Sequence, residues 1–264
     1  MKDNWNDPSA RTHPTLLGCW LTLASAAAAE ALAHVGFDWL LIDTEHAPND
    51  TKDVAEQLRA IDAARAHGAS PDVAVRVAWN DPVLVKRVMD CGAQTIFFPT
   101  IDTVEQARRA VASTRFPDGA NGGTRGVAGL VRGGKFGMDP AYVPAANAKA
   151  CAVVQIESVT AVENVEEISQ VEGVDCLFIG PADLSASLGQ IGKGRSPVLL
   201  QAIDRVLRAC EHAGKPAGIF AADVEEAAFY RGRGISVIAL HSDVAWLTRG
   251  ATSAIKSFEE FRNA

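Results

Sequence analysis

The sequence predicts a single α/β domain folded as a (β/α)₈ barrel, on three observations. Eight apolar runs of strand length recur along the chain, amphipathic segments separate most of them, and the runs are continuously rather than alternately hydrophobic. Continuous hydrophobicity indicates strands that are buried on both faces, as in a parallel sheet. Eight such units close most simply into a barrel, and 264 residues is an ordinary length for one.

The expected strands follow one another at regular intervals between turn residues. They span 16–23, 39–43, 73–77, 95–99, 151–156, 176–180, 217–220 and 236–240. The intervening segments, such as "TKDVAEQLRAIDAARAHG", have helical periodicity, and several end on the glycine that commonly follows a helix. We expect one domain over 1–264, with 1–14 as a flexible tail. Residues 243–264 form a terminal helix that packs on its own barrel or on a neighbour's.

One connection is much longer than the others. The glycine-rich segment 116–150 separates the fourth and fifth expected strands and contains no repeat. Long connections inside compact domains are usually functional, so we expect an active-site loop here, with disorder as the alternative.

Composition excludes several classes of protein. The formal net charge is −7, with both signs mixed along the chain, so no basic stripe is available for nucleic acid. Five scattered cysteines without a Cys-x-x-Cys pair indicate reduced thiols in a cytoplasm. The N-terminus lacks the apolar core of a signal peptide, and "ASAAAAEALAHVG" is too short to cross a bilayer. We expect a soluble cytoplasmic protein with no membrane partner.

Polar residues cluster where the expected strands end. In a (β/α)₈ barrel all these ends open onto one mouth, so residues distant in sequence converge there. The stretch "LLIDTEHAP" shows the pattern, since a buried strand finishes on acidic residues and a histidine. The residues placed at the mouth in this way are Asp43, Glu45, His46, Arg76, Gln155, Glu157 and Asp183.

Two of these carboxylates suit a divalent cation. Glu157 and Asp183 follow adjacent strands, and Mg²⁺ or Mn²⁺ takes oxygen ligands while keeping positions for water or substrate. A 2-oxo acid can fill two such positions, and the metal can stabilise charge on its keto oxygen. The alternative is that both residues are helix N-terminal acids bonded to free backbone N–H groups.

Further residues suit acid–base and anion chemistry. Arg76 is permanently charged and can hold an oxyanion, although a structural ion pair is the simpler role. His46 is the candidate general base, because imidazole titrates near neutral pH. Asp43 or Glu45 can orient its ring, while Asp43 can equally bond to backbone. Asp90 is another possible partner, but a capping role is favoured.

Other positions can contact a substrate. "GPADLS" offers successive backbone N–H groups for a substrate carboxylate, Trp20 can line the pocket or fill the barrel, and Arg125 can reach in from the long segment. The lysines lie before strands or in helices and loops, which disfavours a Schiff-base mechanism. No dinucleotide, Walker or nucleophile-elbow motif is found, so we expect a metal and no organic cofactor.

Ordered blocks of the sequence resemble one family. "LGCWLTLASAAAAEALAHVGFDWLLIDTEHAPND", "CGAQTIFFPTIDTVEQARRAVASTRFP", "VVQIES" and "VEGVDCLFIGPADLSASLG" are similar to the HpcH/HpaI family of metal-dependent pyruvate aldolases, from about Leu16 onward. The resemblance implies a barrel of the phosphoenolpyruvate/pyruvate-binding type. It also implies a lyase that reversibly cleaves a 4-hydroxy-2-oxo acid to pyruvate and an aldehyde, and a hexamer whose C-terminal helix is exchanged between subunits.

The resemblance also implies roles for individual positions. The metal carboxylates fall on Glu157 and Asp183, with Mg²⁺, Mn²⁺ or Co²⁺ as the metal. The pyruvate-holding arginine falls on Arg76, and the base, acting through water, on His46. The remaining substrate contacts implied are the Ala182 and Asp183 amides, Gln155 and Trp20.

Two departures from the family pattern concern the aldehyde side. The segment before Arg125 is longer than in many relatives, which disfavours aldehyde selection by this residue. Where relatives run "VGVD" this chain has "LHSD", which places His241 at the mouth. The alternatives to an aldolase are another reaction through the same enolate, such as oxaloacetate decarboxylation or thioester cleavage, and a non-catalytic barrel that binds an oxo acid.

Overall fold

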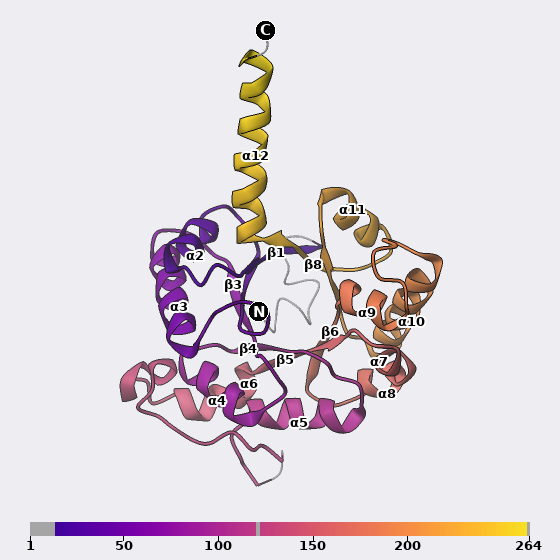
Figure 1. The fold of residues 1–264 in the computed structure, drawn as a ribbon. Helices are drawn as coiled ribbons and strands as arrows, with labels where there is room; N and C mark the ends of the chain where they lie inside the picture. Colours follow the sequence, from indigo (N-terminus) through magenta and orange to yellow (C-terminus); the bar gives the residue numbers. More distant parts are fainter. Residues whose placement is uncertain (1–13, 120–121, 263–264) are drawn as a thin grey trace.

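The computed structural model describes residues 14–119 and 122–262, and the predicted tail lies outside these ranges except for Pro14. Eight strands form one closed parallel barrel, with each strand bonded to the next along the chain and β8 bonded to β1 (Figure 1). The predicted (β/α)₈ architecture is therefore confirmed. The strands are β1 (Leu16–Leu21), β2 (Trp39–Asp43), β3 (Asp72–Arg76), β4 (Thr95–Phe98), β5 (Cys151–Ile156), β6 (Val174–Ile179), β7 (Ala217–Ala221) and β8 (Val237–Ser242).

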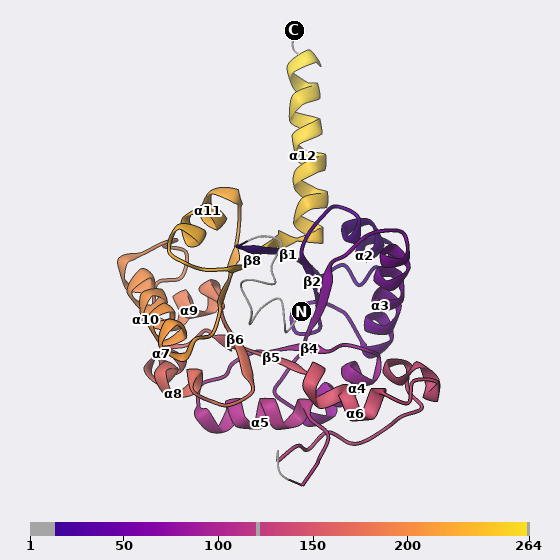
Figure 2. The same ribbon diagram turned by 180° about the vertical axis from the view of Figure 1, so that it is seen from behind.

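Helices surround the barrel and carry the chain from the end of one strand to the start of the next (Figures 1 and 2). Side-chain caps fix where several of them begin. Thr103 and Gln106 form a capping box at the start of α5, so the helix starts at a defined distance from β4. The helical elements are α2 (Ala26–Ala33), α3 (Thr51–Ala66), α4 (Pro82–Asp90), α5 (Val104–Thr114), η2 (Arg132–Gly137), α6 (Tyr142–Lys149), α7 (Val159–Glu163), α8 (Val165–Ser169), α9 (Pro181–Ser187), α10 (Pro197–Ala213), α11 (Val224–Gly232) and α12 (Asp243–Arg262).

Strand boundaries agree with the sequence prediction at β2 and β5 and differ by a few residues elsewhere. The difference at β8 matters for the site, because this strand continues through His241 and Ser242 rather than ending at Leu240. Hydrophobicity does not mark this end, since the last residues of β8 face the mouth and are polar.

The apolar core has two layers, one inside the barrel and one between the strands and the helices. Aromatic rings fill the inner layer, and the Trp39 ring stacks on Phe97 at a centroid distance of 5.8 Å. A Cβ atom on Gly18 would lie 2.1 Å from the Trp39 ring. A glycine at position 18 is therefore required for the tryptophan to occupy the barrel interior.

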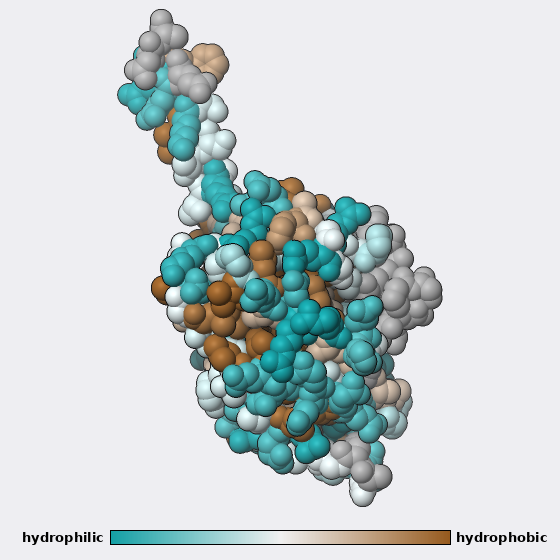
Figure 3. Space-filling model, turned by 90° about the vertical axis from the view of Figure 1, so that its right-hand side faces the viewer, coloured by the Kyte–Doolittle hydropathy of each residue, from teal (hydrophilic) through white to brown (hydrophobic). Residues whose placement is uncertain are grey.

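The last helix, α12, extends away from the barrel (Figures 1 and 2). Only its first turn packs on the body, through Ala245 and Trp246, and the described side chains from Leu247 onward are exposed. Hydrophobic side chains are visible on the projecting part (Figure 3), and the large ones are Leu247, Ile255, Phe258 and Phe261. Within the described residues, neither this helix nor any other has the length and apolar character needed to traverse a membrane.

Candidate active site

The carboxyl ends of the strands enclose a cavity of about 280 Å³. Its wall draws on strands from all round the barrel, so residues from opposite ends of the chain, such as Trp20 and His241, line the same space. The lining residues are Trp20, Thr22, Asp43, His46, Arg76, Gln155, Phe178, Gly180, Pro181, Ala182, Asp183, Phe220, His241 and Ser242. The mouth predicted from the strand ends is therefore a real cavity.

Arg76 is buried at the end of β3 and is held by two carboxylates. Its Nε and Nη2 donate to the two oxygens of Asp43, each at 2.8 Å, and its Nη1 lies 2.7 Å from Glu45 Oε2. Its guanidinium also lies over the Trp20 ring, 4.1 Å from the centroid. These contacts fix the plane of the guanidinium: two of its five N–H groups donate to Asp43, and Nη1 forms an ion pair with Glu45.

The register of the barrel explains the pairing of Asp43 with Arg76. The two residues are direct neighbours in the parallel ladder between β2 and β3, and both side chains enter the barrel mouth. Asn49 donates to the Asp43 carbonyl at 2.7 Å, which fixes the end of β2. Asp43 therefore positions Arg76 and is not available to orient the His46 ring.

His46 is exposed, with 67% of its side chain accessible, and Asp183 is exposed as well. The carboxylate beside it is Glu45, whose Oε1 lies 3.9 Å from His46 Nε2. Glu45 thus contacts both Arg76 and His46. Burial raises the pKa of the Glu45 carboxyl above its ordinary value, although the charge of Arg76 opposes this effect.

Glu157 lies just past the end of β5 and is nearly inaccessible. Its Oε1 accepts from the Thr100 backbone N–H at 2.7 Å, and its Oε2 accepts from Gln155 Nε2 at 2.6 Å. Burial raises the pKa of Glu157, and the nearby carboxylate of Asp183 raises it further. Two carboxylates that repel each other in this way indicate a place where positive charge is stabilising.

The surroundings of Glu157 fit a divalent cation. Gly180 directly follows β6, and a Cβ atom there would lie 2.5 Å from Glu157 Oε2. Only glycine therefore lets the chain pass this close to the carboxylate. In the described ranges no group of three or more potential metal-ligating His, Cys, Asp or Glu side chains is found. Mg²⁺ and Mn²⁺ do not need three such side chains, because they accept two carboxylates and complete their coordination shell with water and substrate oxygens.

One functional residue was not anticipated from the sequence. Thr100 follows β4 directly, has a backbone φ of +53°, and holds Glu157 through both its N–H and its hydroxyl. A positive φ is rare for threonine and marks a constrained position. The rule that identified the other residues, namely that the mouth collects strand ends, points to this position as well.

The described residues of the long glycine-rich segment, 116–119 and 122–150, do not line this mouth. The segment connects the C-terminus of α5 to the start of β5, and strand starts form the opposite rim of a (β/α)₈ barrel. The expectation of an active-site loop is therefore corrected. Parts of the segment are regular, since η2 and α6 lie within it.

Arg125, in the same segment, is likewise not brought to the substrate cavity. It is 2% exposed, and its Nη2 donates to Asp90 at 2.9 Å and to the Tyr142 hydroxyl at 2.7 Å. Its guanidinium also stacks on Phe116 at 4.3 Å. These contacts correct both the substrate-binding role expected for Arg125 and the capping role favoured for Asp90, which is an ion-pair partner.

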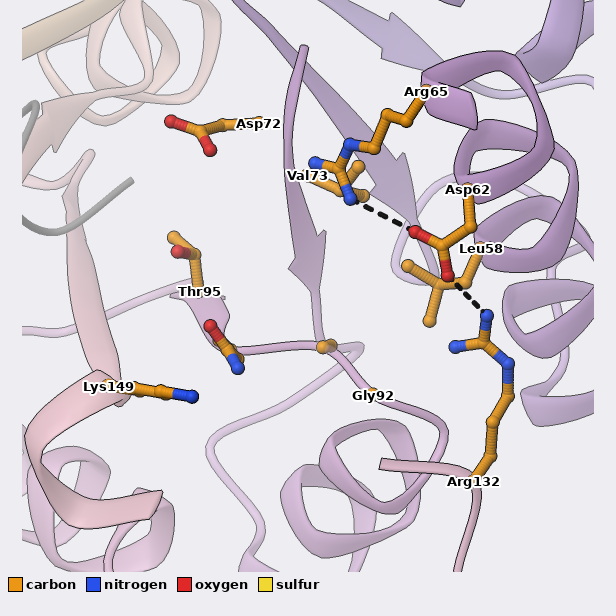
Figure 4. Close-up of a pocket in the computed structure, with 11 residues that line it drawn as sticks. Leu58, Asp62, Arg65, Asp72, Val73, Gly92, Thr95, Arg132 and Lys149 are labelled. Carbon is orange, nitrogen blue, oxygen red and sulfur yellow. Dashed lines mark hydrogen bonds and ion pairs between the residues drawn. The ribbon is translucent and has the colours of Figure 1, made fainter. Parts of the chain in front are cut away.

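A separate cavity of about 260 Å³ lies at the opposite rim (Figure 4). Asp72 and Thr95, which begin β3 and β4, line it. Its two arginines are both paired with Asp62, Arg65 at 3.1 Å and Arg132 at 2.6 Å. One carboxylate thus compensates their charge in part, and this cavity does not share the residues of the mouth.

Comparison with known proteins identifies the family. The family model for HpcH/HpaI aldolase/citrate lyase matches residues 16–249. The chain belongs to the HpcH/HpaI family.

Relatives in this family are similar over most of their length. The chain is 51% identical over 242 residues to a hydroxypyruvate/pyruvate aldolase of Paraburkholderia phytofirmans, covering 91% of this chain and 92% of the relative. It is 40% identical over 264 residues to a 4-hydroxy-2-oxo-heptane-1,7-dioate aldolase of Salmonella dublin, covering 100% of this chain and 97% of the relative. A solved structure of an HpcH/HpaI aldolase/citrate lyase family protein from Burkholderia cenocepacia J2315 has 50% sequence identity and a TM-score of 0.89. The match covers 93% of this chain and 95% of the solved chain.

Proposed function

We propose that this HpcH/HpaI protein is a metal-dependent class II aldolase that reversibly cleaves a 4-hydroxy-2-oxo acid into pyruvate and an aldehyde. The HpcH/HpaI family and relatives named as aldolases make the chain a carbon–carbon lyase of the aldolase type. The observation that carries the specific reaction is the arrangement of the mouth. Arg76, Gln155 and Asp183 line one cavity, and Glu157 lies against its wall at Gly180.

The residues that would hold the cation are Glu157 and Asp183. When bound, Mg²⁺, Mn²⁺ or Co²⁺ supplies a Lewis acid that polarises the keto group of the 2-oxo acid. Thr100 and Gln155 orient Glu157 through hydrogen bonds to its two oxygens, so the ligand geometry is set before the cation arrives. No organic cofactor is required.

Arg76 binds the pyruvyl group. Two of its N–H groups donate to Asp43 and its Nη1 is ion-paired with Glu45, so the guanidinium presents its remaining donors in a fixed direction. A fixed positive charge stabilises the enolate oxygen without reorganisation during the reaction. The Ala182 and Asp183 amides, at the start of α9, bind the substrate carboxylate from the other side of the cavity.

His46 moves the proton of the 4-hydroxyl group. In cleavage the hydroxyl loses its proton to His46 through water, the C3–C4 bond breaks, and the carbon bearing the hydroxyl becomes the aldehyde carbonyl. The electron pair of the broken bond stays on the pyruvyl fragment as the enolate. Protonation of the enolate at C3 then gives pyruvate, and the reverse sequence gives aldol addition.

Two variants test these roles. His46→Ala and Arg76→Lys should each lower kcat/KM for aldol cleavage by about a hundredfold or more, because a base and a bidentate anion holder are lost. His34→Ala, at an exposed position that ends α2, is the matched control. The assay measures pyruvate and aldehyde together.

The products separate this reaction from its alternatives. Decarboxylation releases CO₂ without an aldehyde, thioester cleavage requires a thioester substrate, and a non-catalytic barrel gives no product. Undiminished cleavage by His46→Ala would remove this residue from the mechanism.

The assembly is part of the same proposal. The protein acts in the cytoplasm as a homo-oligomer, a hexamer in which α12 packs on a neighbouring subunit. The apolar side chains along the projecting part of α12 support this arrangement, because they remain exposed on a single chain.

A further inference from the structure

His241, near the end of the last strand, has an unusual backbone conformation at the mouth. Its φ is +61°, in the left-handed region where glycine is the usual residue. The β1–β8 ladder explains this conformation. Gly18 pairs with Ala239 but Trp20 pairs with Ser242, so β8 carries one extra residue between these pairs. Such a bulge redirects a side chain, here the imidazole that lines the cavity.

The neighbours of His241 form an aromatic wall on one side of the cavity. The wall starts at Trp20, which lies against Arg76, and continues to Phe220 at 5.4 Å between ring centroids. Phe220 lies 6.0 Å from the His241 ring, which in turn lies 6.2 Å from Trp246 in α12. The wall therefore begins at the residue that contacts Arg76, the proposed pyruvyl holder, and reaches His241.

The barrel order places this wall beside the cation ligands, on the strands that follow them. Glu157 and Asp183 follow β5 and β6, whereas Trp20, Phe220 and His241 belong to β1, β7 and β8, which are consecutive around the barrel. Arg76, Phe220 and His241 line the same cavity, so this wall is available to the remaining carbons of a substrate whose pyruvyl end is held by Arg76.

His241 gives this apolar wall a polar group. Its Nδ1 is buried, and no hydrogen-bond partner for it is found among residues 14–119 and 122–262. Burial lowers the pKa of the imidazole, and the charge of Arg249 lowers it further, although Asp223 opposes them. The neutral ring has one donor and one acceptor nitrogen, which suits a hydroxyl group.

We propose that His241 is a specificity-determining residue that hydrogen-bonds a hydroxyl group of the aldehyde, so that the enzyme prefers hydroxylated aldehydes to alkyl aldehydes of the same size. This inference rests on the proposed aldolase function and names the class of its second substrate. A strained backbone is retained at a position where the side chain is used, and the imidazole lines the cavity, where a bound hydroxyl can reach the ring.

The test is aldol addition of pyruvate to glycolaldehyde and to propanal, which differ by a hydroxyl in place of a methyl group. Wild-type protein should show the higher kcat/KM with glycolaldehyde. In His241→Gly, which accommodates the positive φ, the ratio of the two kcat/KM values should fall by about tenfold, the value of one hydrogen bond. His241→Asn also tolerates this backbone and keeps a polar side chain, so its ratio should stay above that of His241→Gly.

Two results would overturn the inference: a wild-type preference for propanal, or an unchanged ratio in His241→Gly, as when activity falls equally with both aldehydes. An Asn variant no more selective than the Gly variant would also contradict a hydrogen-bonding role. The wild-type comparison does not depend on the folding of any variant. If the wild type adds pyruvate to neither aldehyde, the proposed function itself fails, whereas activity without hydroxyl selectivity refutes only the role of His241.

Discussion

At the scale of single residues, the centre of the site is the Arg76 guanidinium, which is ion-paired with two carboxylates. Asp43 is 1% exposed and holds Arg76 with two hydrogen bonds, whereas Glu45 makes one ion-pair contact and is partly accessible. Removing one partner of a fully buried pair leaves an uncompensated charge, while a more accessible partner is replaced in part by water. The two carboxylates should therefore differ greatly in their contribution to stability.

The matched substitutions Asp43→Asn and Glu45→Gln test this difference, since each neutralises one partner of Arg76 without changing its size. Asp43→Asn should lower the free energy of unfolding by about 3 kcal/mol, whereas Glu45→Gln should change it by less than about 1 kcal/mol in either direction. Urea unfolding at one protein concentration measures both. Equal losses would show that the bidentate geometry does not set the stability of the site.

The Glu45→Gln variant also has a pH signature. Burial raises the pKa of Glu45 in the folded protein above its ordinary value of 4.5. The folded state then holds this proton to higher pH than the unfolded chain, so the stabilisation is present below about 4.5 and is lost as the pH rises through the folded pKa. Glu45→Gln should show a smaller loss of stability over this pH range than wild type.

Residue identities at the mouth were predictable, but their partners were not. Arg76, His46 and Glu157 follow directly from the rule that strand ends converge. Which carboxylate pairs with Arg76 depends on the register of β2 against β3 and on side-chain rotamers, and neither is encoded in local sequence. The register pairs Asp43 with Arg76, and Glu45 contacts both Arg76 and His46.

At the scale of elements, α12 is the part of the fold that projects furthest from the body. Its exposed hydrophobic residues Leu247, Ile255 and Phe258 recur at helical spacing and lie on one face. An exposed apolar stripe of this kind is stabilised when it is covered.

The double substitution Leu247→Glu with Phe258→Glu should therefore shift the protein to a smaller species in sedimentation velocity, because charge is placed in the contact. Ser253→Glu adds charge on the opposite face of the helix and should leave the assembly intact. An unchanged assembly in the double variant would contradict the packing of α12 on another subunit.

The segment 116–150 shows where prediction of single elements fails. Its length and glycine content indicate a functional loop, but these features do not say which rim of the barrel it occupies. The position is set by chain order, since a segment between the end of α5 and the start of β5 lies at the rim of strand starts. The helical pattern of 104–114 precedes the segment, so the segment leads from a helix into the next strand. That order was enough to place it at the rim of strand starts.

At the scale of the whole molecule, the barrel is the most predictable feature. Continuous apolar runs require cover on both faces, and eight of them separated by helices have one simple closed arrangement. Termini of strands such as β8 were less predictable, because their last residues face a polar mouth. Deviations from the hydrophobic pattern thus coincide with the site itself.

The central claim is that a cation held by Glu157 and Asp183 makes this mouth an aldolase site. The most direct measurement follows pyruvate and aldehyde release from 4-hydroxy-2-oxopentanoate by protein treated with EDTA, before and after addition of Mn²⁺. We expect cleavage to be lost on chelation, to return with Mn²⁺ in the wild type, and not to return in Glu157→Gln. Full cleavage in EDTA, or restoration by Mn²⁺ in Glu157→Gln, would contradict the account.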